Sequence, residues 1–156
     1  MAHFFVAIIR LFGSLLYYHL HFESDGKDVI VMLNEKLLEI LSHPVDGAVS
    51  IMTNGVDGPH LVNTWNSYIE VTSEEKLLIP AYGFLRTEKN IGADNAITLS
   101  IASREVEGYR AKGTGVIVKG SARFINSGED FDRMKTKFDW ARAILEVTVR
   151  DVKQTL

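Results

Sequence analysis

Hydrophobic and polar residues alternate in a series of short runs along the chain, and a period of two is typical of β-strands buried on one face. The runs lie at residues 48–53, 58–71, 97–101, 115–125 and 141–149, and a shorter apolar run lies at 76–80. Residues that favour turns, mainly Gly, Pro, Asn and Asp, separate several of them. The pattern therefore predicts about six strands, with a charged, glycine-containing loop over 104–115.

Helical spacing is confined to a few short segments. Leucines at helical spacing follow Asn34, a good N-cap residue, and predict a helix that ends before Pro44. Two further helices are predicted, one capped by Thr87 and one by Ser127. About six strands with two or three short helices close most naturally as a small antiparallel barrel with helices at its ends, because closure removes exposed sheet edges. We therefore expect a mainly β fold.

The run from Gly58 to Tyr68 has an unusually polar centre for a strand. A strand that served only a core would carry Val or Ile there, whereas this one surrounds two aromatic side chains with amides and hydroxyls: Asn63, Thr64, Trp65, Asn66, Ser67 and Tyr68. Such residues suit a site for a flat, hydrogen-bonding aromatic ligand. The alternative is a solvent-facing edge strand with a half-buried Trp65.

A second polar cluster follows the apolar run at 76–80. The chain turns at Gly83 and enters the predicted helix, which places the amides of the helix start beside Arg86, Thr87 and Lys89. Helix-start amides, a hydroxyl and a guanidinium together suit a phosphate dianion. The alternative is an ordinary capped helix whose basic residues face water.

Residues 1–31 differ from the rest of the chain. The segment from Phe4 to Phe22 is almost wholly apolar and approaches the length of a bilayer span, but a central Arg10 costs about 2.5–3.5 kcal/mol on insertion scales. A signal peptide requires basic residues before its apolar run, and the chain has no Lys or Arg there. We favour an upstream extension from a misplaced start, with the domain at residues 32–156. The alternatives are a membrane anchor and an added packing element, and membrane contact is expected only if residues 1–31 are a genuine anchor.

Composition excludes several classes of function. The chain has 156 residues, 46% of them hydrophobic, and a net charge of −3, which suits one globular domain and gives no nucleic-acid footprint. It contains no cysteine, so disulfides, thiolate metal sites and cysteine nucleophiles are excluded. The five histidines are scattered, and none has a carboxylate at metal-ligand spacing. No side chain stands out as a general base or nucleophile, so no catalytic residue is assigned.

Five separated blocks of the sequence carry a resemblance to a known family. They lie at residues 57–68, 86–88, 113–115, 140–143 and 154–156. Over residues 32–156 the chain resembles the small FMN-binding proteins of the pyridoxamine-5′-phosphate-oxidase-like split-barrel superfamily, in which these blocks occur in the same order and at nearly the same spacing. The resemblance implies a six-stranded split barrel, a homodimer, and FMN bound non-covalently at the dimer interface.

The resemblance also implies where FMN would be bound. Asn63, Thr64 and Trp65 would line the isoalloxazine ring and its ribityl chain, and Tyr68 and Trp140 would flank the ring.

Arg86 and Thr87 would hold the phosphate, and Arg86 stands where the family's small member has Lys, a change that keeps the charge and adds a bidentate fork. Leu156 would reach the flavin of the other subunit. Asp46 corresponds to an acidic residue near the cofactor. Tyr82 and Gly83 lie in the turn that approaches FMN, where Tyr82 replaces a small residue.

Taken together, the sequence predicts a cytoplasmic FMN-dependent electron-transfer or oxidoreductase protein with an unidentified redox partner. The first alternative is an enzyme related to pyridoxamine-phosphate oxidase or to flavin reductases, which would need a substrate pocket over the flavin. Crowding by Trp65, Tyr68 and Trp140 argues against a roomy one. The second alternative is a non-redox module that binds haem or stores FMN, and among the histidines only His60 is close in sequence to the predicted site.

Overall fold

The computed structural model describes residues 6–11, 14–19 and 33–156, and contacts divide the chain into a unit of residues 1–32 and a unit of residues 33–156. In the first unit, β1 (Val6–Leu11) pairs antiparallel with β2 (Ser14–His19). No helix within the described ranges is long and apolar enough to cross a membrane. The described residues do not include 1–5, 12–13 and 20–32. Much of the prediction for residues 1–31 falls on these ranges, so that prediction stays untested.

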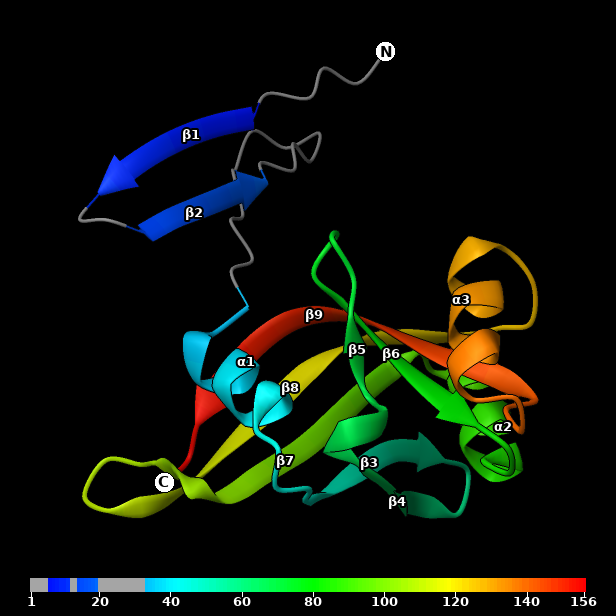
Figure 1. Cartoon of the computed structure of the whole chain (residues 1–156). Coiled ribbons are helices and arrows are strands. Elements are labelled where there is room, and N and C mark those ends of the chain that lie inside the picture. Colours follow the sequence, from blue (N-terminus) through cyan, green and yellow to red (C-terminus); the bar gives the residue numbers. More distant parts are fainter. Residues whose placement is uncertain (1–5, 12–13, 20–32) are drawn as a thin grey trace, which may run out of the picture. The chain divides into compact units, whose positions relative to one another are not determined.

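The second unit is built on one antiparallel sheet of seven strands, in the order β4-β3-β7-β8-β9-β6-β5 (Figure 1). The strands are β3 (Ala48–Gly55), β4 (Gly58–Trp65), β5 (Glu70–Val71), β6 (Lys76–Ala81), β7 (Ala96–Glu107), β8 (Lys112–Ile125) and β9 (Ala143–Gln154). The helices are α1 (Glu35–Ser42), α2 (Leu85–Ala93) and α3 (Glu129–Lys137), with a short 3-10 turn, η1 (Asn66–Tyr68). The mainly β fold with short helices that the sequence predicts is confirmed.

The sheet has one strand more than expected because the run at 58–71 is divided in two. β4 ends at Trp65, and η1 separates it from the two-residue β5. Asn66 causes the break. Its backbone N–H still donates to the carbonyl of Gly47 at 3.0 Å, in register with the β3–β4 pairing, but its buried side-chain oxygen accepts the N–H of Gly47. The backbone carbonyl of Asn66 accepts instead from the N–H of Ile69 at 3.0 Å, which closes η1.

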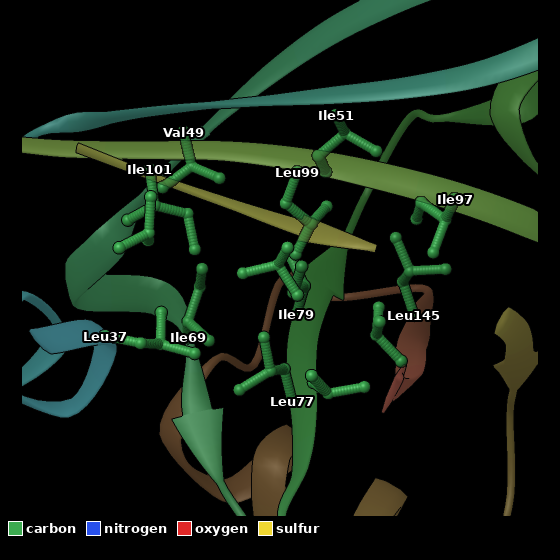
Figure 2. Packing of buried hydrophobic residues seen from close by; sticks show 14 of the residues in the cluster. Leu37, Val49, Ile51, Ile69, Leu77, Ile79, Ile97, Leu99, Ile101 and Leu145 are labelled. Atoms are coloured by element: carbon green, nitrogen blue, oxygen red, sulfur yellow. The ribbon is translucent and has the colours of Figure 1, made fainter. Parts of the chain in front are cut away.

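The core lies inside the curve of this sheet. Val49 of β3 and Leu99 of β7 lie with Leu77 and Ile79 of β6 in one cluster, and all four are fully buried (Figure 2). β3 and β6 are each next to last at opposite ends of the strand order. Their side chains share a core because the sheet curls on itself, as the predicted barrel requires.

The loop predicted over 104–115 is largely a hairpin, which corrects the prediction. β7 continues to Glu107 and β8 resumes at Lys112, with Ser103 opposite Thr114 and an irregularity in register before the Glu107–Lys112 pair. Exposed charged residues hide the strand pattern here, because Val106 is the one buried residue in the range 104–113.

Helix starts follow the prediction in one case and depart from it in another. The Asn34 side chain accepts a hydrogen bond from the backbone N–H of Lys36 at 2.8 Å and caps α1 as expected. Ser127 does not cap α3, whose N-cap is Gly128 at φ 99°, a left-handed conformation that favours glycine.

Met134 of α3 packs with Leu78 of the sheet in a second, smaller core.

One carboxylate is buried on β9. Glu146 is 5% exposed, and its two oxygens accept hydrogen bonds from Nε and Nη2 of Arg123 on β8 at 2.6 and 3.2 Å. The hydrogen bond to Glu146, assisted by its charge, raises the pKa of Arg123 above its ordinary value. Lys76 lies 3.9 Å from the same carboxylate.

Candidate functional site

The connection from β6 into α2 does not follow the predicted cap. The helix begins at Leu85, so Thr87 is its third residue and the prediction that Thr87 is the N-cap is wrong. The N-cap position is taken by Phe84, which has left-handed backbone angles of φ 57° and ψ 20° and provides no side-chain cap. The N–H of Glu88 donates to the Phe84 carbonyl at 2.8 Å, and the three N–H groups before it have no partner within the helix.

The hydroxyl of Thr87 is buried without a partner. The side chain is fully buried, and Oγ1 makes no hydrogen bond to any residue of 33–156. A buried hydroxyl without a hydrogen bond is costly, so a group supplied from outside the chain would relieve the cost. This hydroxyl and the uncapped first turn of α2 fit a phosphate group, which accepts hydrogen bonds from both.

Arg86 lies on the same turn and is half exposed. Its Nη2 is 3.8 Å from a carboxylate oxygen of Asp57 in the β3–β4 turn, and the Asp57 side chain is 85% exposed. An ion pair this long and this exposed contributes little, so it leaves the guanidinium available for a stronger anion. The phosphate-binding pair implied by the sequence, Arg86 and Thr87, is thus on one helical turn.

Three aromatic rings lie together between η1 and the start of β9. Tyr68 is 5.3 Å from Phe138 and 5.5 Å from Trp140, measured between ring centroids, and Phe138 is 5.8 Å from Trp140. Trp140 is 41% exposed, whereas Phe138 is buried and forms the inner side of the group. The two residues expected to flank the ring are therefore neighbours, and Phe138, which the sequence reasoning did not assign to the site, holds them.

Arg142, two residues after Trp140, holds the turn that leads into α2. Its guanidinium donates to the carbonyls of Tyr82 and Gly83, both at 3.3 Å, and to Oε2 of Glu88 at 2.5 Å. Sequence reasoning missed this role, although Arg142 lies in one of the five blocks of the resemblance. Tyr82 itself is 73% exposed.

β4 places its three predicted residues on different faces. The Asn63 side chain is exposed and accepts a hydrogen bond from the Ser50 hydroxyl at 2.9 Å, and Trp65 is 49% exposed. Thr64 points the other way and is 6% exposed. β4 lies at the edge of the sheet, so the edge-strand alternative describes its position correctly.

Asp46 holds the segment that follows β4. One of its oxygens accepts hydrogen bonds from the backbone N–H groups of Ser67 and Gly47, both at 3.0 Å, and the other accepts from the Ser67 hydroxyl at 2.9 Å. This carboxylate therefore fixes η1, and with it the direction of Trp65 and Tyr68 on either side.

Leu156 is not brought together with the other predicted residues. Its carbonyl accepts hydrogen bonds from the Thr114 hydroxyl at 2.9 Å and from Gln154 at 2.6 Å, so the tail is held at the β7–β8 end. It lines an open surface cavity of about 640 Å³ with Tyr109 and Thr114. The C-terminus and α2 lie at opposite ends of the unit (Figure 1).

A relative matches most of this chain in sequence. The chain is 42% identical over 125 residues to the FMN-binding protein of Nitratidesulfovibrio vulgaris (strain DSM 19637 / Miyazaki F), and the match covers 80% of this chain and 100% of that protein. No family model matches the chain.

Solved structures share the fold at low sequence identity. HupZ of Group A Streptococcus aligns with a TM-score of 0.64 and 13% identity over 79% of this chain and 94% of that one. An FMN-binding protein from Syntrophomonas wolfei aligns with a TM-score of 0.61 and 14% identity over 78% and 85%. A putative pyridoxamine 5′-phosphate oxidase from Lactobacillus delbrueckii gives 0.60 and 15% over 78% and 93%. At these identities the likeness confirms the split-barrel fold alone.

Proposed function

The chain belongs to the family of the small FMN-binding proteins, and from this premise we propose that it binds FMN and uses it for electron transfer. The observation that carries the proposal is the buried, unpartnered hydroxyl of Thr87 in the uncapped first turn of α2. An anionic ligand that ends in a phosphate supplies acceptors for this hydroxyl and for the adjacent amides at once.

The residues of the site would bind the three parts of FMN separately. The Thr87 hydroxyl, the helix-start amides and Arg86 would hold the phosphate. Tyr68 and Trp140 would provide an aromatic wall for the ring, because offset and tilted ring contacts favour flat aromatic ligands. Trp65 would cover the ring from the edge strand.

Other predicted residues would orient the cofactor. Asn63 offers an exposed amide for the rim of the ring or the ribityl hydroxyls, and Asp46 would keep η1 in position. Thr64, which is buried, would act through packing. FMN would supply the redox chemistry, and the chain would contribute binding, orientation and exclusion of water.

We further propose a homodimer in which the tail of one subunit completes the site of the other. β9 has 12 residues and a contour length of about 40 Å at the ordinary strand rise, so Leu156 lies far from Trp140 of its own chain. The outward face of β4 exposes Leu61 (64%) and Trp65 (49%) on an edge strand, a surface that suits a second copy. Leu156, 61% exposed, would pack against the partner's flavin and shield it from water.

Flavin titration into apo protein tests the proposal. We expect the wild-type chain to show flavin absorbance after purification, and Arg86→Ala to weaken FMN binding by more than about 1.5 kcal/mol, the scale of one charge-assisted hydrogen bond. Riboflavin, which lacks the phosphate, should lose little.

The matched control is Lys89→Ala, which removes an equal charge from an exposed position of the same helix. It should change FMN affinity less than Arg86→Ala does. Equal losses for the two flavins would remove Arg86 from the phosphate site, and a Soret band in place of flavin bands would favour the haem-binding alternative.

A further inference from the structure

The turn before α2 is held by one side chain from the segment that leads into β9. The backbone of Arg142 is fixed by its N–H, which donates to the Ala81 carbonyl at 2.8 Å, and by its buried alanine neighbours. From there the guanidinium reaches the carbonyls of Tyr82 and Gly83 and the carboxylate of Glu88. One residue thus fixes both the turn and the first acidic side chain of the helix.

Glu88 is the acidic residue in the first turn of α2. A carboxylate there is attracted to the positive end of the helix dipole and accepts hydrogen bonds from uncapped amides. No side chain of residues 33–156 caps this helix, although Glu88 is on the correct turn to approach its free N–H groups. The carboxylate is bound to Arg142 at 2.5 Å instead.

A carboxylate on these amides would compete with a bound phosphate. Both anions require the same N–H donors, and a fixed negative charge beside the donors also repels a dianion. The pairing with Arg142 removes both effects, because it neutralises Glu88 and holds it to one side. The hydrogen bonds from Arg142 to the carbonyls of Tyr82 and Gly83 reduce the repulsion of a phosphate further, because the negative ends of these two peptide dipoles then face the guanidinium.

We propose that Arg142 is a positioning residue that keeps Glu88 off the first-turn amides of α2 and so keeps that turn open for the phosphate of the flavin. This inference rests on the proposed function. It assigns to Arg142 no contact with the ligand and attributes its effect to Glu88, which distinguishes it from a direct phosphate contact such as that proposed for Arg86.

The test is a double-mutant cycle read by flavin affinity. We expect Arg142→Ala to weaken FMN binding about tenfold or more, because the released Glu88 carboxylate would take one charge-assisted contact with the amides away from the phosphate. Riboflavin binding should weaken less than about threefold. Arg142→Ala combined with Glu88→Gln should recover FMN affinity to within about threefold of wild type, because the neutral amide no longer competes as an anion. Glu88→Gln alone should leave FMN affinity unchanged or tighter.

Controls keep the outcomes separate. If Arg142→Ala does not fold, Arg142→Gln replaces it, since glutamine can still donate to a turn carbonyl but leaves Glu88 charged. The inference is overturned if adding Glu88→Gln to Arg142→Ala does not recover FMN affinity, or if Arg142→Ala weakens FMN and riboflavin binding equally. In either case FMN binding by the wild-type protein would still support the proposed function. If wild-type protein binds neither flavin, both are wrong.

Discussion

Replacing Thr87 by valine is expected to move stability and affinity in opposite directions. Valine has nearly the shape of threonine and a similar helix propensity, so the substitution exchanges a buried, unpartnered hydroxyl for a methyl group and changes little else. An ordinary buried threonine would lose a hydrogen bond in this exchange. Thr87 has none to lose within residues 33–156.

The magnitude follows from the two states of the site. In the apo protein, removal of an unsatisfied buried hydroxyl, which costs about 1–3 kcal/mol, should stabilise the fold by about 1 kcal/mol. For a chain of this size that raises the melting temperature by about 2–4 °C. In the complex, loss of a hydrogen bond to a charged phosphate costs about 1.5–3 kcal/mol, or roughly a 10- to 100-fold weaker FMN affinity.

Thermal or urea unfolding of the apo protein and titration with FMN and riboflavin measure both quantities. The matched control is Thr53→Val, because Thr53 is 2% exposed and its Oγ1 accepts a hydrogen bond from Asn90 Nδ2 at 3.1 Å. That change leaves the buried Asn90 amide without its partner and should destabilise the apo protein by about 1–2 kcal/mol.

The reasoning is refuted by the reverse pattern. If Thr87→Val destabilises the apo protein as Thr53→Val does and leaves FMN affinity unchanged, the hydroxyl has a partner inside the fold and does not contact the ligand.

Three further predictions concern the rest of the chain. Removing Leu156, whose side chain is 61% exposed, should leave the fold intact, raise flavin fluorescence and shift the midpoint potential; unchanged fluorescence and potential would mean that the tail does not reach a flavin. A protein that begins at Met32 should be soluble and dimeric and should bind FMN like the full chain, and loss of folding or membrane partitioning of the full chain would contradict the extension interpretation. Arg123→Ala should destabilise the protein by about 1–3 kcal/mol, because it leaves the buried Glu146 carboxylate with only a distant lysine; denaturant unfolding measures it, and a change below about 0.5 kcal/mol would show that water replaces the pair.

The sequence by itself determined the features that depend on near neighbours. Alternation defines the faces of β3 and β8, the Asn34 side chain starts α1, and the glycines at 55 and 58 close the β3–β4 hairpin. The family resemblance also follows from sequence, because it rests on short blocks of residues at fixed spacing. The alternation, the cap and the hairpin glycines each operate within one turn or one strand, and the resemblance needs only the order of the blocks along the chain.

Only the tertiary structure decided where α2 begins and what holds it. Phe84 takes the left-handed N-cap position that local propensity assigned to Thr87, and the turn beside it is held by Arg142, which is 59 residues from Gly83 in sequence. The division of the run at 58–71 likewise depends on Asn66, which bonds to Gly47 across 19 residues. Sequence periodicity records which face of an element is buried, but it carries no record of which distant backbone groups will need a partner once the sheet has closed.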